Sequence, residues 1–413
     1  MSNLLLSFYG DDFTGSTDAM ESLARGGVRT VLFTQPPTPE QLARYDGLRA
    51  FGIAGTTRAM PPDQMERALR PALAAMRACG APIVHYKVCS TFDSSPTIGS
   101  IGRAIDVGAD VFGAGVVPVV VGAPALGRYC VFGNLFARCG PDSEPYRLDR
   151  HPSMSRHPTT PMDEADLRVH LSKQTHKTIG LVDVLQLDRG GPPAIARVGA
   201  EVVLIDLLSD AQLATVGRLI AEGATRPTPR FVVGSSGVES ALMAYWERET
   251  RSFPPVGHVG PILAVCGSCS PVTVGQIDWA VAHGFADVPF DAGAAARDAR
   301  AALREGRSVV LHARGARTGT DIGPTLGRLA REVLVSTPNL RRVLIAGGDT
   351  SGRVAAALGI ESLEMIGELT RGAPLCRATA PGRPADGAEL TFKGGQIGPV
   401  DFFGRVLSGG GDV

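Results

Sequence analysis

The sequence has no excess of charge of either sign: 41 lysine and arginine residues face 41 aspartate and glutamate residues, and neither sign forms a long run. A basic surface for nucleic acid or for an anionic membrane is therefore not expected. Long hydrophobic stretches are missing too. The apolar start ends at Asp11 and Asp12, too early for a signal peptide or a membrane helix, and later stretches are interrupted by Gly, Pro or charge.

Cysteine is scarce, with seven residues in a chain of 413, and the number is odd. This pattern favours reduced thiols in a cytoplasmic protein over a disulfide framework. The eight histidines show no H-E-x-x-H or comparable metal-binding spacing. His85 lies inside an apolar stretch and is expected to be a buried core residue rather than a ligand.

The chain is too long for one ordinary core, so two domains are expected. Short apolar runs alternate with amphipathic segments in both halves, which indicates right-handed crossovers and mainly parallel sheets. Residues 248–260, rich in charge and then in Pro and Gly, are the predicted linker. We therefore predict an α/β, bilobal protein with helices flanking the sheet in each domain, 1–247 and 261–408.

Residues 123–161 interrupt the alternation. Gly, Pro, Arg and His are dense there, and Arg and His cluster between Arg147 and His157. A long irregular stretch in a compact protein is more often functional than idle. A helix is predicted to begin at Thr160–Pro161, because a hydroxyl cap, a proline and two acidic residues follow one another.

Two neighbouring carboxylates, Asp11 and Asp12, directly follow the first predicted strand and precede a helix. Ligands of open α/β sheets bind at such strand ends. A solvated turn with an Asp cap is the alternative reading. Arg58, Lys87, Ser90 and Asp93 also fall at or just beyond strand ends, although Arg58 and Lys87 could equally be surface charges. Two cations among hydroxyls and carboxylates suit a small polyhydroxylated acid.

Several loops in the second half share one pattern: an apolar strand, then Gly with Ser or Thr, then a helix. They are Cys266–Pro271, Arg314–Gly323 and Gly347–Gly352. Glycines let backbone N–H groups approach an anion, and a helix amino terminus favours negative charge. Lys393 next to two glycines adds positive charge. The P-loop spacing and a GxGxxG opening a helix are both absent, yet three such loops in one domain indicate a nucleotide site.

Cys266 and Cys269 match the C-x-x-C redox pattern between a strand and a helix. The match consists of two cysteines only, and the surrounding domain is glycine-rich in a phosphate-binding style. Redox chemistry is therefore the less favoured reading.

The segment Asp11–Asp18 resembles the amino-terminal signature of the four-carbon acid sugar kinases, which phosphorylate threonate, erythronate or 3-oxotetronate with ATP. The loop Lys87–Ser94, followed by Gly102, is similar to that of the 3-oxotetronate kinases, whereas threonate kinases usually have Asp where Cys89 stands. Gly267–Ser270, Gly347–Ser351 and Lys393–Gly398 resemble the family's three nucleotide loops, in the family's order.

The resemblance implies a sugar-acid domain, then an ATP domain, with the active site in the interdomain cleft. Asp12 is the predicted catalytic residue, with Asp11 as the alternative. The predicted substrate-binding residues are Asp12, Arg58, Lys87, Val88, Cys89, Ser90 and Asp93. The predicted ATP-binding residues are Ser268, Ser270, Gly347, Gly348, Asp349, Thr350, Lys393, Gly394, Gly395 and Gln396, and Asp349 is also the predicted Mg²⁺ ligand.

Two features depart from the family pattern. Asp349 stands where Glu is common, which shortens its reach to a metal or a ribose. Lys393–Ile397 reads Lys-Gly-Gly-Gln-Ile in place of the more usual Lys-Ser-Gly-Asn-Phe, so adenine or ribose contacts are expected to differ.

The sequence thus predicts a cytoplasmic, ATP- and Mg²⁺-dependent kinase of the terminal hydroxyl of a small sugar acid or oxo-sugar acid, with 3-oxotetronate giving the 4-phosphate. Threonate, erythronate and branched oxo-acids such as 3-oxo-isoapionate stay open as substrates, and a homodimer stays open as the assembly. The competing classes are a non-catalytic sugar-acid or nucleotide sensor and an NAD-dependent dehydrogenase. The missing dinucleotide fingerprint disfavours the dehydrogenase.

Overall fold

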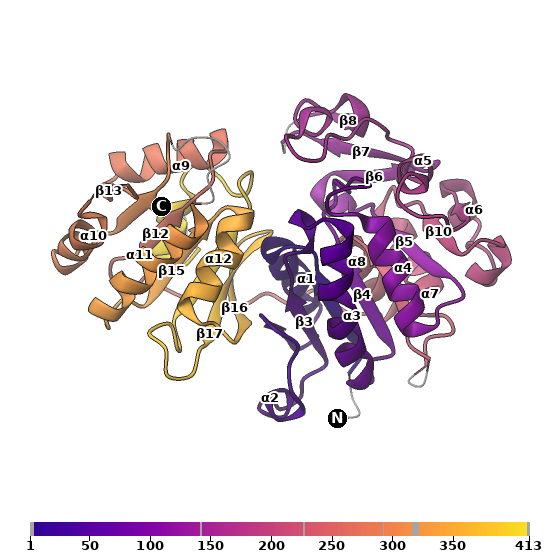
Figure 1. The fold of residues 1–413 in the computed structure, drawn as a ribbon, viewed down its shortest axis with the longest axis horizontal. Coiled ribbons are helices and arrows are strands. Elements are labelled where there is room, and N and C mark those ends of the chain that lie inside the picture. Colours follow the sequence, from indigo (N-terminus) through magenta and orange to yellow (C-terminus); the bar gives the residue numbers. More distant parts are fainter. Residues whose placement is uncertain (1–3, 141–142, 226–227, 292, 316–321, 411–413) are drawn as a thin grey trace. The chain divides into compact units, whose positions relative to one another are not determined.

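The structure is a computed structural model that describes residues 4–140, 143–225, 228–291, 293–315 and 322–410. The predicted loop Arg314–Gly323 therefore lies largely outside the described residues. The chain forms two compact units (Figure 1). The first unit comprises the chain up to Asp11, Ser22–Thr30 and Pro36–Thr250; the second comprises Asp12–Glu21, Val31–Gln35 and the chain from Arg251.

The first unit is built on a parallel sheet with the strand order β3-β1-β4-β11-β5-β10-β9. Its strands are nearly continuous apolar runs, as expected for a parallel sheet covered on both faces. The strands are β1 (Leu6–Gly10), β3 (Ala50–Ala54), β4 (Ile83–Lys87), β5 (Val117–Val120), β9 (Ile179–Val182), β10 (Val202–Ile205) and β11 (Arg230–Gly234).

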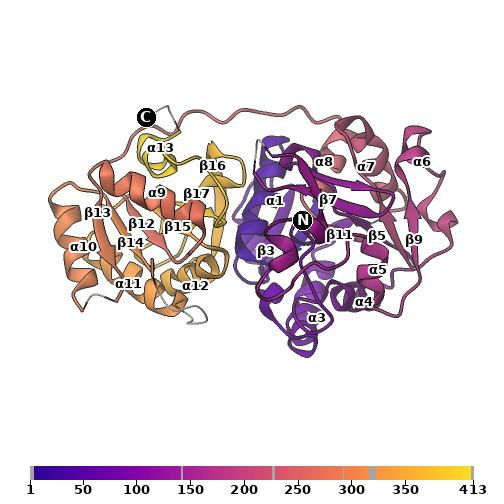
Figure 2. The same ribbon diagram turned by 90° about the horizontal axis from the view of Figure 1, so that it is seen from above.

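Helices cover both faces of this sheet: α3 and α4 pack together on one face, and α7 and α8 on the other (Figure 2). Buried Leu69, Leu73 and Met76 form the apolar stripe of α3. The helices of the first half are α1 (Phe13–Arg25), α2 (Pro39–Ala43), α3 (Pro62–Ala78), α4 (Ile101–Phe112), α5 (Leu167–Ser172), α6 (Val184–Asp188), α7 (Leu213–Ala221) and α8 (Gly237–Tyr245).

His85 of β4 is fully buried, as predicted. Its Nδ1 lies 2.6 Å from Glu239 Oε1, and its Nε2 lies 3.0 Å from the carbonyl oxygen of Gly234. Both ring nitrogens therefore have a partner inside the first unit, which is how a buried imidazole avoids a desolvation penalty.

The segment predicted to be irregular contains a small antiparallel sheet of β6 (Arg128–Val131), β7 (Asn134–Arg138) and β8 (Pro145–Arg147). The prediction that a helix begins at Thr160–Pro161 is wrong. The N–H and the hydroxyl of Thr160 both point to His157 Nδ1, at 3.1 and 3.0 Å, so Thr160 caps no helix. Helix α5 begins at Leu167 instead, where the carboxylate of Asp166 accepts the Arg168 N–H at 2.9 Å.

The second unit has the strand order β13-β14-β12-β15-β18-β17-β16-β2. The pairs from β13 to β18 are parallel, as predicted, whereas β17, β16 and β2 add an antiparallel edge that the sequence pattern did not indicate. The strands are β2 (Thr30–Phe33), β12 (Leu263–Cys266), β13 (Ala286–Pro289), β14 (Val309–His312), β15 (Arg342–Ala346), β16 (Ser362–Thr370), β17 (Ala373–Thr379) and β18 (Glu389–Lys393).

In this unit α11 and α12 pack together on one face of the sheet, and α9 and α13 lie on the other (Figure 2). The helices are α9 (Pro271–Ala282), α10 (Ala295–Arg304), α11 (Gly323–Ser336), α12 (Gly348–Leu358) and α13 (Phe402–Ser408). The predicted α/β class is confirmed. No helix in the described part of the chain has the length and apolar character needed to cross a membrane.

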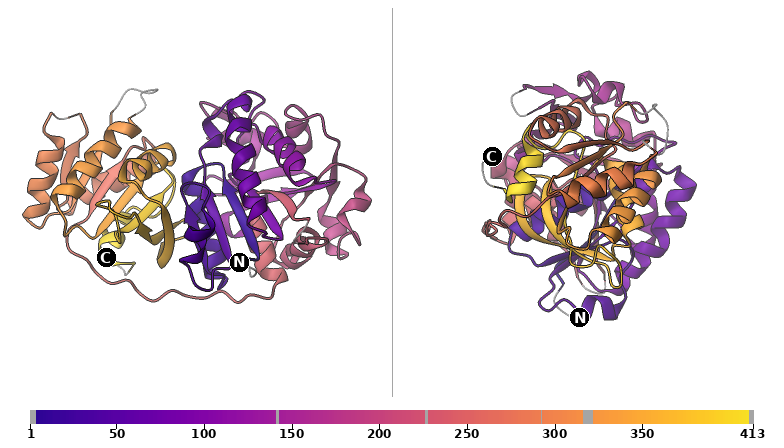
Figure 3. Two further views of the ribbon diagram at one scale, coloured as in Figure 1. Left: turned by 60° about the horizontal axis from the view of Figure 1, so that its bottom comes forward. Right: turned by 90° about the vertical axis from the view of Figure 1, so that its left-hand side faces the viewer.

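The chain between α8 and β12 has no helix or strand over residues 248–260 (Figure 3). Its last part is attached to the second unit. The Val259 N–H donates to the carbonyl oxygen of Leu407 at 3.2 Å, and the Gly257 carbonyl accepts from Arg342 at 3.3 Å.

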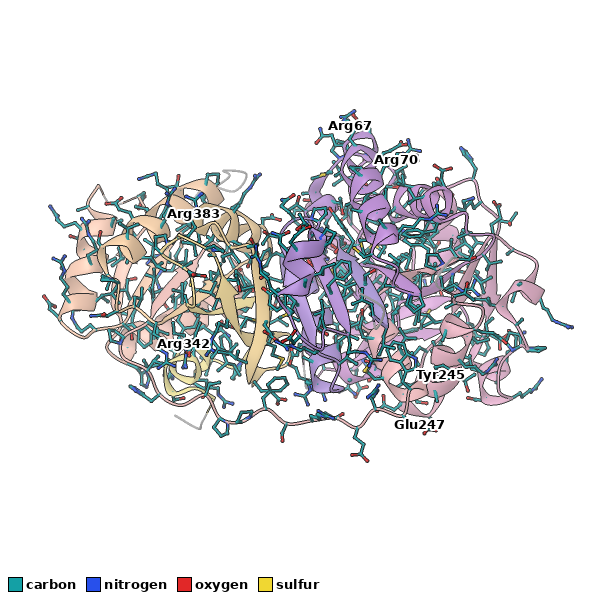
Figure 4. All side chains as sticks on the ribbon, turned by 90° about the horizontal axis from the view of Figure 1, so that it is seen from below. Arg67, Arg70, Tyr245, Glu247, Arg342 and Arg383 are labelled. Carbon is teal, nitrogen blue, oxygen red and sulfur yellow. The ribbon has the colours of Figure 1, made fainter. Side chains whose placement is uncertain are left out.

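Arg342 of β15 is fully buried inside the second unit, in contrast to Arg67 and Arg70 of α3, which project from the surface (Figure 4). Its Nε and Nη2 donate to Glu389 Oε2 at 2.9 and 2.7 Å, and its Nη1 donates to the carbonyl oxygen of Val406 at 2.7 Å. One guanidinium thus connects two neighbouring strands, helix α13 and the end of the linker.

Arg342→Met should destabilise the second unit by about 3–5 kcal/mol, because it leaves the Glu389 carboxylate buried without this partner. Arg341→Met is the matched control. Arg341 pairs with the same carboxylate at 3.1 Å, but its side chain is 67% exposed, so about 1 kcal/mol or less is expected.

The measurement is urea unfolding followed by the fluorescence of Trp279 in α9, with Trp246 replaced by Phe; these are the two tryptophans of the chain. Equal losses for the two arginine variants would contradict the structural role given to Arg342.

Candidate active site

The predicted substrate residues gather at one edge of the first sheet. Strands β3, β1 and β4 are parallel neighbours, so their carboxyl ends meet at the same edge. Asp11 follows β1, Arg58 follows β3, and the loop Lys87–Asp93 begins at the end of β4. The Asp11 N–H donates to the Lys87 carbonyl at 2.9 Å, and the Arg58 N–H donates to the Asp11 carbonyl at 3.0 Å.

Asp11 and Arg58 form a two-pronged ion pair. Arg58 Nε donates to Asp11 Oδ2 at 3.1 Å, and Nη2 donates to Oδ1 at 2.7 Å. Asp11 is buried, and the Arg58 side chain is 25% exposed. Burial and the charge of Asp11 raise the pKa of Tyr9 to about 12. The Nε and Nη2 groups of Arg58, which together could bind a substrate carboxylate, are therefore already bonded to Asp11.

Asp12 caps helix α1. Its Oδ1 accepts the Gly15 N–H at 2.7 Å, and its Oδ2 accepts the Thr14 hydroxyl at 3.0 Å. The capping alternative raised by the sequence therefore describes this carboxylate's local geometry. The same bonds hold the carboxylate in a fixed position at the start of a helix, where the helix dipole stabilises negative charge.

The loop after β4 is held together by its own polar side chains. Lys87 is buried, and its Nζ donates to the Val88 carbonyl at 3.1 Å. The Cys89 thiol lies 2.9 Å from the Thr91 hydroxyl, which donates to Asp93 Oδ1 at 2.7 Å. These contacts bring the predicted substrate residues Lys87, Val88, Cys89 and Asp93 into one loop.

Asp93 is buried in this loop. Burial raises its pKa, but the charge of Arg58, the bond from Thr91 and the charge of His157 outweigh that effect and lower the pKa overall. Asp93 is therefore an ionised acceptor at neutral pH. Ser90 is half-buried beside it.

Sequence reasoning missed the support beneath this loop. Ser94 Oγ lies 2.9 Å from His170 Nε2 of α5, and Gln174 Nε2 donates to Ser94 Oγ at 3.0 Å. Burial lowers the pKa of His170 to about 4, so the imidazole is neutral. The partners lie 76 and 80 residues apart in the chain, and no local pattern indicates such contacts.

The three predicted nucleotide loops lie side by side in the second unit. They follow β12, β15 and β18, which are adjacent parallel strands. The Gly267 N–H donates to the Ala346 carbonyl at 3.0 Å, and the Gly347 N–H donates to the Lys393 carbonyl at 2.9 Å. The Thr273 hydroxyl donates to the Gly395 carbonyl at 2.9 Å, which ties the start of α9 to the third loop.

Glycine is required where these loops touch. A Cβ on Gly267 would lie 2.0 Å from the Thr350 hydroxyl, and a Cβ on Gly395 would lie 2.6 Å from Ser268 Oγ. Gly394 is different, because its Cβ would have no neighbour closer than 3.4 Å. Gly394, which stands where the family usually has Ser, is thus the one of these two glycines that tolerates a side chain.

The loop after β15 opens helix α12. Gly347 has a φ of 122°, a backbone conformation that favours glycine. Gly348 is the first residue of α12, and a Cβ there would meet nothing closer than 3.7 Å. The space at the helix amino terminus is therefore bounded by Asp12 Oδ2 at 3.7 Å and Thr14 Oγ1 at 3.9 Å, and the N–H groups and the helix dipole there favour phosphate.

Polar groups around this space fit an anionic ligand. Ser270 Oγ is buried and has no hydrogen-bond partner among the described residues, while Ser268 Oγ accepts the Ser270 N–H at 3.2 Å. Lys393 is fully buried, with Nζ 2.9 Å from the Thr273 hydroxyl, and burial lowers its pKa to about 8. Asp349 and Gln396 are exposed.

The C-x-x-C pair does not form a disulfide, since both cysteines are free. Cys266 is buried, and burial raises its pKa to about 12, so its thiol stays protonated and unreactive. Cys269 is exposed. This geometry disfavours the redox reading.

The two units therefore define a class of protein that offers acidic and basic side chains at one sheet edge and glycine-rich loops before a helix amino terminus in a separate unit. Residues 6–242 match a sugar-binding N-terminal domain, and residues 263–403 match a nucleotide-binding C-terminal domain. The chain belongs to the four-carbon acid sugar kinase family.

Known relatives match almost the whole chain. A 3-oxo-isoapionate kinase of Paraburkholderia graminis is 48% identical, with 98% of this chain and 94% of the relative covered. A 3-oxo-tetronate kinase of Methylobacterium radiotolerans is 32% identical, with 98% and 99% covered. The chain is accordingly an ATP-using kinase of a sugar acid, a phosphotransferase with an alcohol group as acceptor.

Solved structures confirm the fold. A protein of Salmonella typhimurium LT2 superposes with a TM-score of 0.78 at 23% identity, covering 97% of this chain and 98% of its own. A Haemophilus influenzae protein superposes with a TM-score of 0.72 at 21% identity, over the same shares of the two chains.

Gly348→Val should weaken ATP binding by about 100-fold or more, roughly 2.8 kcal/mol, because the side chain would occupy the open space at the start of α12. Gly275→Val in α9 is the control, since a Cβ there meets no neighbour within 4 Å. Isothermal titration calorimetry gives the affinity, and circular dichroism checks folding. A folded Gly348→Val protein with the affinity of the Gly275→Val protein would place the phosphates elsewhere.

Proposed function

We propose that this kinase phosphorylates the terminal hydroxyl of a branched 3-oxo sugar acid of the 3-oxo-isoapionate type, with ATP and Mg²⁺. The observation that carries the proposal is the 48% identity, over nearly the full length, to a kinase of that substrate. 3-Oxotetronate is the second candidate. It is favoured by the Lys87–Ser94 loop, with its Cys89, and by the 32% identical 3-oxo-tetronate kinase.

At the start of helix α1, Asp12 orients or deprotonates the acceptor hydroxyl. The cap bonds support this role, because they fix the carboxylate before substrate arrives, and phosphoryl transfer depends mainly on positioning. Asp11 holds Arg58 in place. Lys87, Val88, Cys89, Ser90 and Asp93 form the substrate loop, in which Asp93 accepts from a substrate hydroxyl.

In the second unit, Ser268, Ser270, Gly347, Gly348, Thr350 and the loop Lys393–Gln396 hold the nucleotide. Among the described residues no group of three or more His, Cys, Asp or Glu side chains could hold a metal ion. A Mg²⁺ ion would take Asp349 as its protein ligand and fill its other positions with phosphate oxygens and water, as is usual for this ion. Bound there, it would supply charge neutralisation for the phosphates.

We also propose that residues 1–247 form the sugar-acid domain and residues 261–408 the ATP domain. A cytoplasmic location agrees with the free state of the seven cysteines.

A substrate panel tests the proposal. ADP release is measured with ATP and each of 3-oxo-isoapionate, 3-oxotetronate, threonate and erythronate. The value of kcat/KM should be at least about tenfold higher for 3-oxo-isoapionate than for the unbranched acids, which is about 1.4 kcal/mol of discrimination. A preference for 3-oxotetronate would select the second candidate. ATP binding without ADP release on any acid would indicate a sensor.

Asp12→Asn should lower kcat by about 10²–10⁴-fold, the usual contribution of a general base. Asparagine caps helices as well as aspartate does, so the fold and α1 should persist. Asp183→Asn is the control, because Asp183 caps α6 with the same geometry away from the site. An Asp12→Asn enzyme with wild-type kcat would leave Asp12 with its capping role alone.

A further inference from the structure

Arg128 lies at the same sheet edge as the predicted substrate residues. It begins β6, directly after the loop that leaves the carboxyl end of β5, and β5 is linked to β4 through β11. The Ala123 N–H donates to the Arg128 carbonyl at 2.9 Å, and the Ser235 hydroxyl after β11 donates to the Val121 carbonyl at 2.7 Å. The loop that carries Arg128 is thus fixed to the neighbouring loop of this edge.

One end of the Arg128 guanidinium is firmly held. Its Nη1 donates to the carbonyl oxygens of Leu126, Gly127 and Arg138, at 2.9, 3.3 and 3.1 Å. Three backbone acceptors on one nitrogen fix the plane of the group. Because a guanidinium does not lose its proton in proteins, the side chain is a permanently charged group in a fixed orientation.

The other end has no protein partner. Arg128 Nε is buried and has no hydrogen-bond partner among the described residues. No ion pair of Arg128 occurs in that part of the chain either. The side-chain hydrogen bonds of Arg128 to the described residues run through Nη1. Burial is the main influence on this cation and lowers its pKa. A half-buried cation without a counter-charge is costly unless a ligand supplies an anion.

Acidic side chains of the same region are already engaged. Asp206 accepts the N–H groups of Phe132 and Gly133, Asp166 pairs with Arg168, and Asp149 pairs with Arg147. The Cys89 thiol near Arg128 is neutral, because burial raises its pKa. Among the described residues, these acidic side chains thus leave Arg128 without a paired carboxylate.

We propose that Arg128 binds the carboxylate of the sugar-acid substrate, through the Nε and Nη2 end of its guanidinium. The contrast with Arg58 carries the inference: Arg58 donates through its Nε and Nη2 to Asp11, whereas among the described residues Arg128 pairs with no carboxylate and its Nε has no hydrogen-bond partner. The proposal rests on the proposed function, since it assumes a substrate with a carboxylate. It assigns the small sheet β6–β8 a place in substrate recognition.

The test compares 3-oxo-isoapionate with its primary amide, which has the same shape without the negative charge. Arg128→Gln should raise KM and Kd for the acid by about 10- to 100-fold, the range of a charge-assisted hydrogen bond. It should leave kcat within about threefold and the constants for the amide unchanged. Arg128→Lys should restore part of the acid affinity. Arg147→Gln is the control, since Arg147 belongs to the same small sheet and pairs with Asp149.

Calorimetry without ATP measures binding independently of phosphoryl transfer. Acid binding that depends on Arg128, in a protein that phosphorylates none of the acids, would overturn the proposed kinase substrate and support the carboxylate site. Equal weakening of acid and amide would make Arg128 a structural residue. Unchanged acid binding in a folded Arg128→Gln protein would overturn the inference and return the carboxylate to Arg58 and Lys87.

Discussion

Charge that is removed from water has to be compensated, and this constraint runs through both units. Asp11 is buried against Arg58 at the edge of the first sheet, and Arg342 against Glu389 in the second unit. Such pairs add little net stability compared with apolar packing, but breaking one by removing a single partner is costly. They therefore fix which groups may stand next to one another. Among the described residues Arg128 has no such partner, which is why we propose a ligand for it.

The second constraint is the geometry of parallel strands. Neighbouring parallel strands bring their following loops to one edge, so residues far apart in the chain meet without any special arrangement. In the first unit this edge gathers carboxylates, cations and hydroxyls. In the second it gathers glycine loops that touch one another at Gly267, Gly347 and Gly395. The difference in chemistry between the units follows from the residues placed after the strands, because both sheets supply the same kind of edge.

Local sequence patterns were sufficient to predict most of the parallel strands, several helices and the loops between them, since an apolar run followed by Gly, Ser or Asp needs no distant information. Pairings were not predictable in this way. The Asp11–Arg58 ion pair joins residues 47 positions apart, and its partners had been assigned separate roles. From the sequence, the cap by Asp12 and a role in ligand binding are alternatives, whereas one carboxylate can serve both purposes.

The errors have physical causes as well. Thr160 and the residues after it have the composition of a helix start, but the Thr160 hydroxyl is bonded to His157. The helix begins only after Asp166, which caps it. The sequence analysis does not predict the edge formed by β16 and β17, because antiparallel pairing in the second unit depends on a hairpin turn rather than on strand-to-helix alternation. The β6–β8 sheet was recognised only as a break in the pattern, since its strands are short and rich in polar residues.

Lys393 gives the nucleotide site an acid–base property. With a pKa near 8 in the folded protein, its ammonium is mainly protonated at pH 7 and loses the proton as the pH rises through 8. A polyphosphate brought to the glycine loops would stabilise the protonated form and raise that pKa. Nucleotide binding near pH 8 would then draw a proton from the buffer, and affinity would fall as the solution becomes more alkaline. If the glycine loops bind phosphate, a buried amine would make their occupancy depend on the proton concentration around the enzyme.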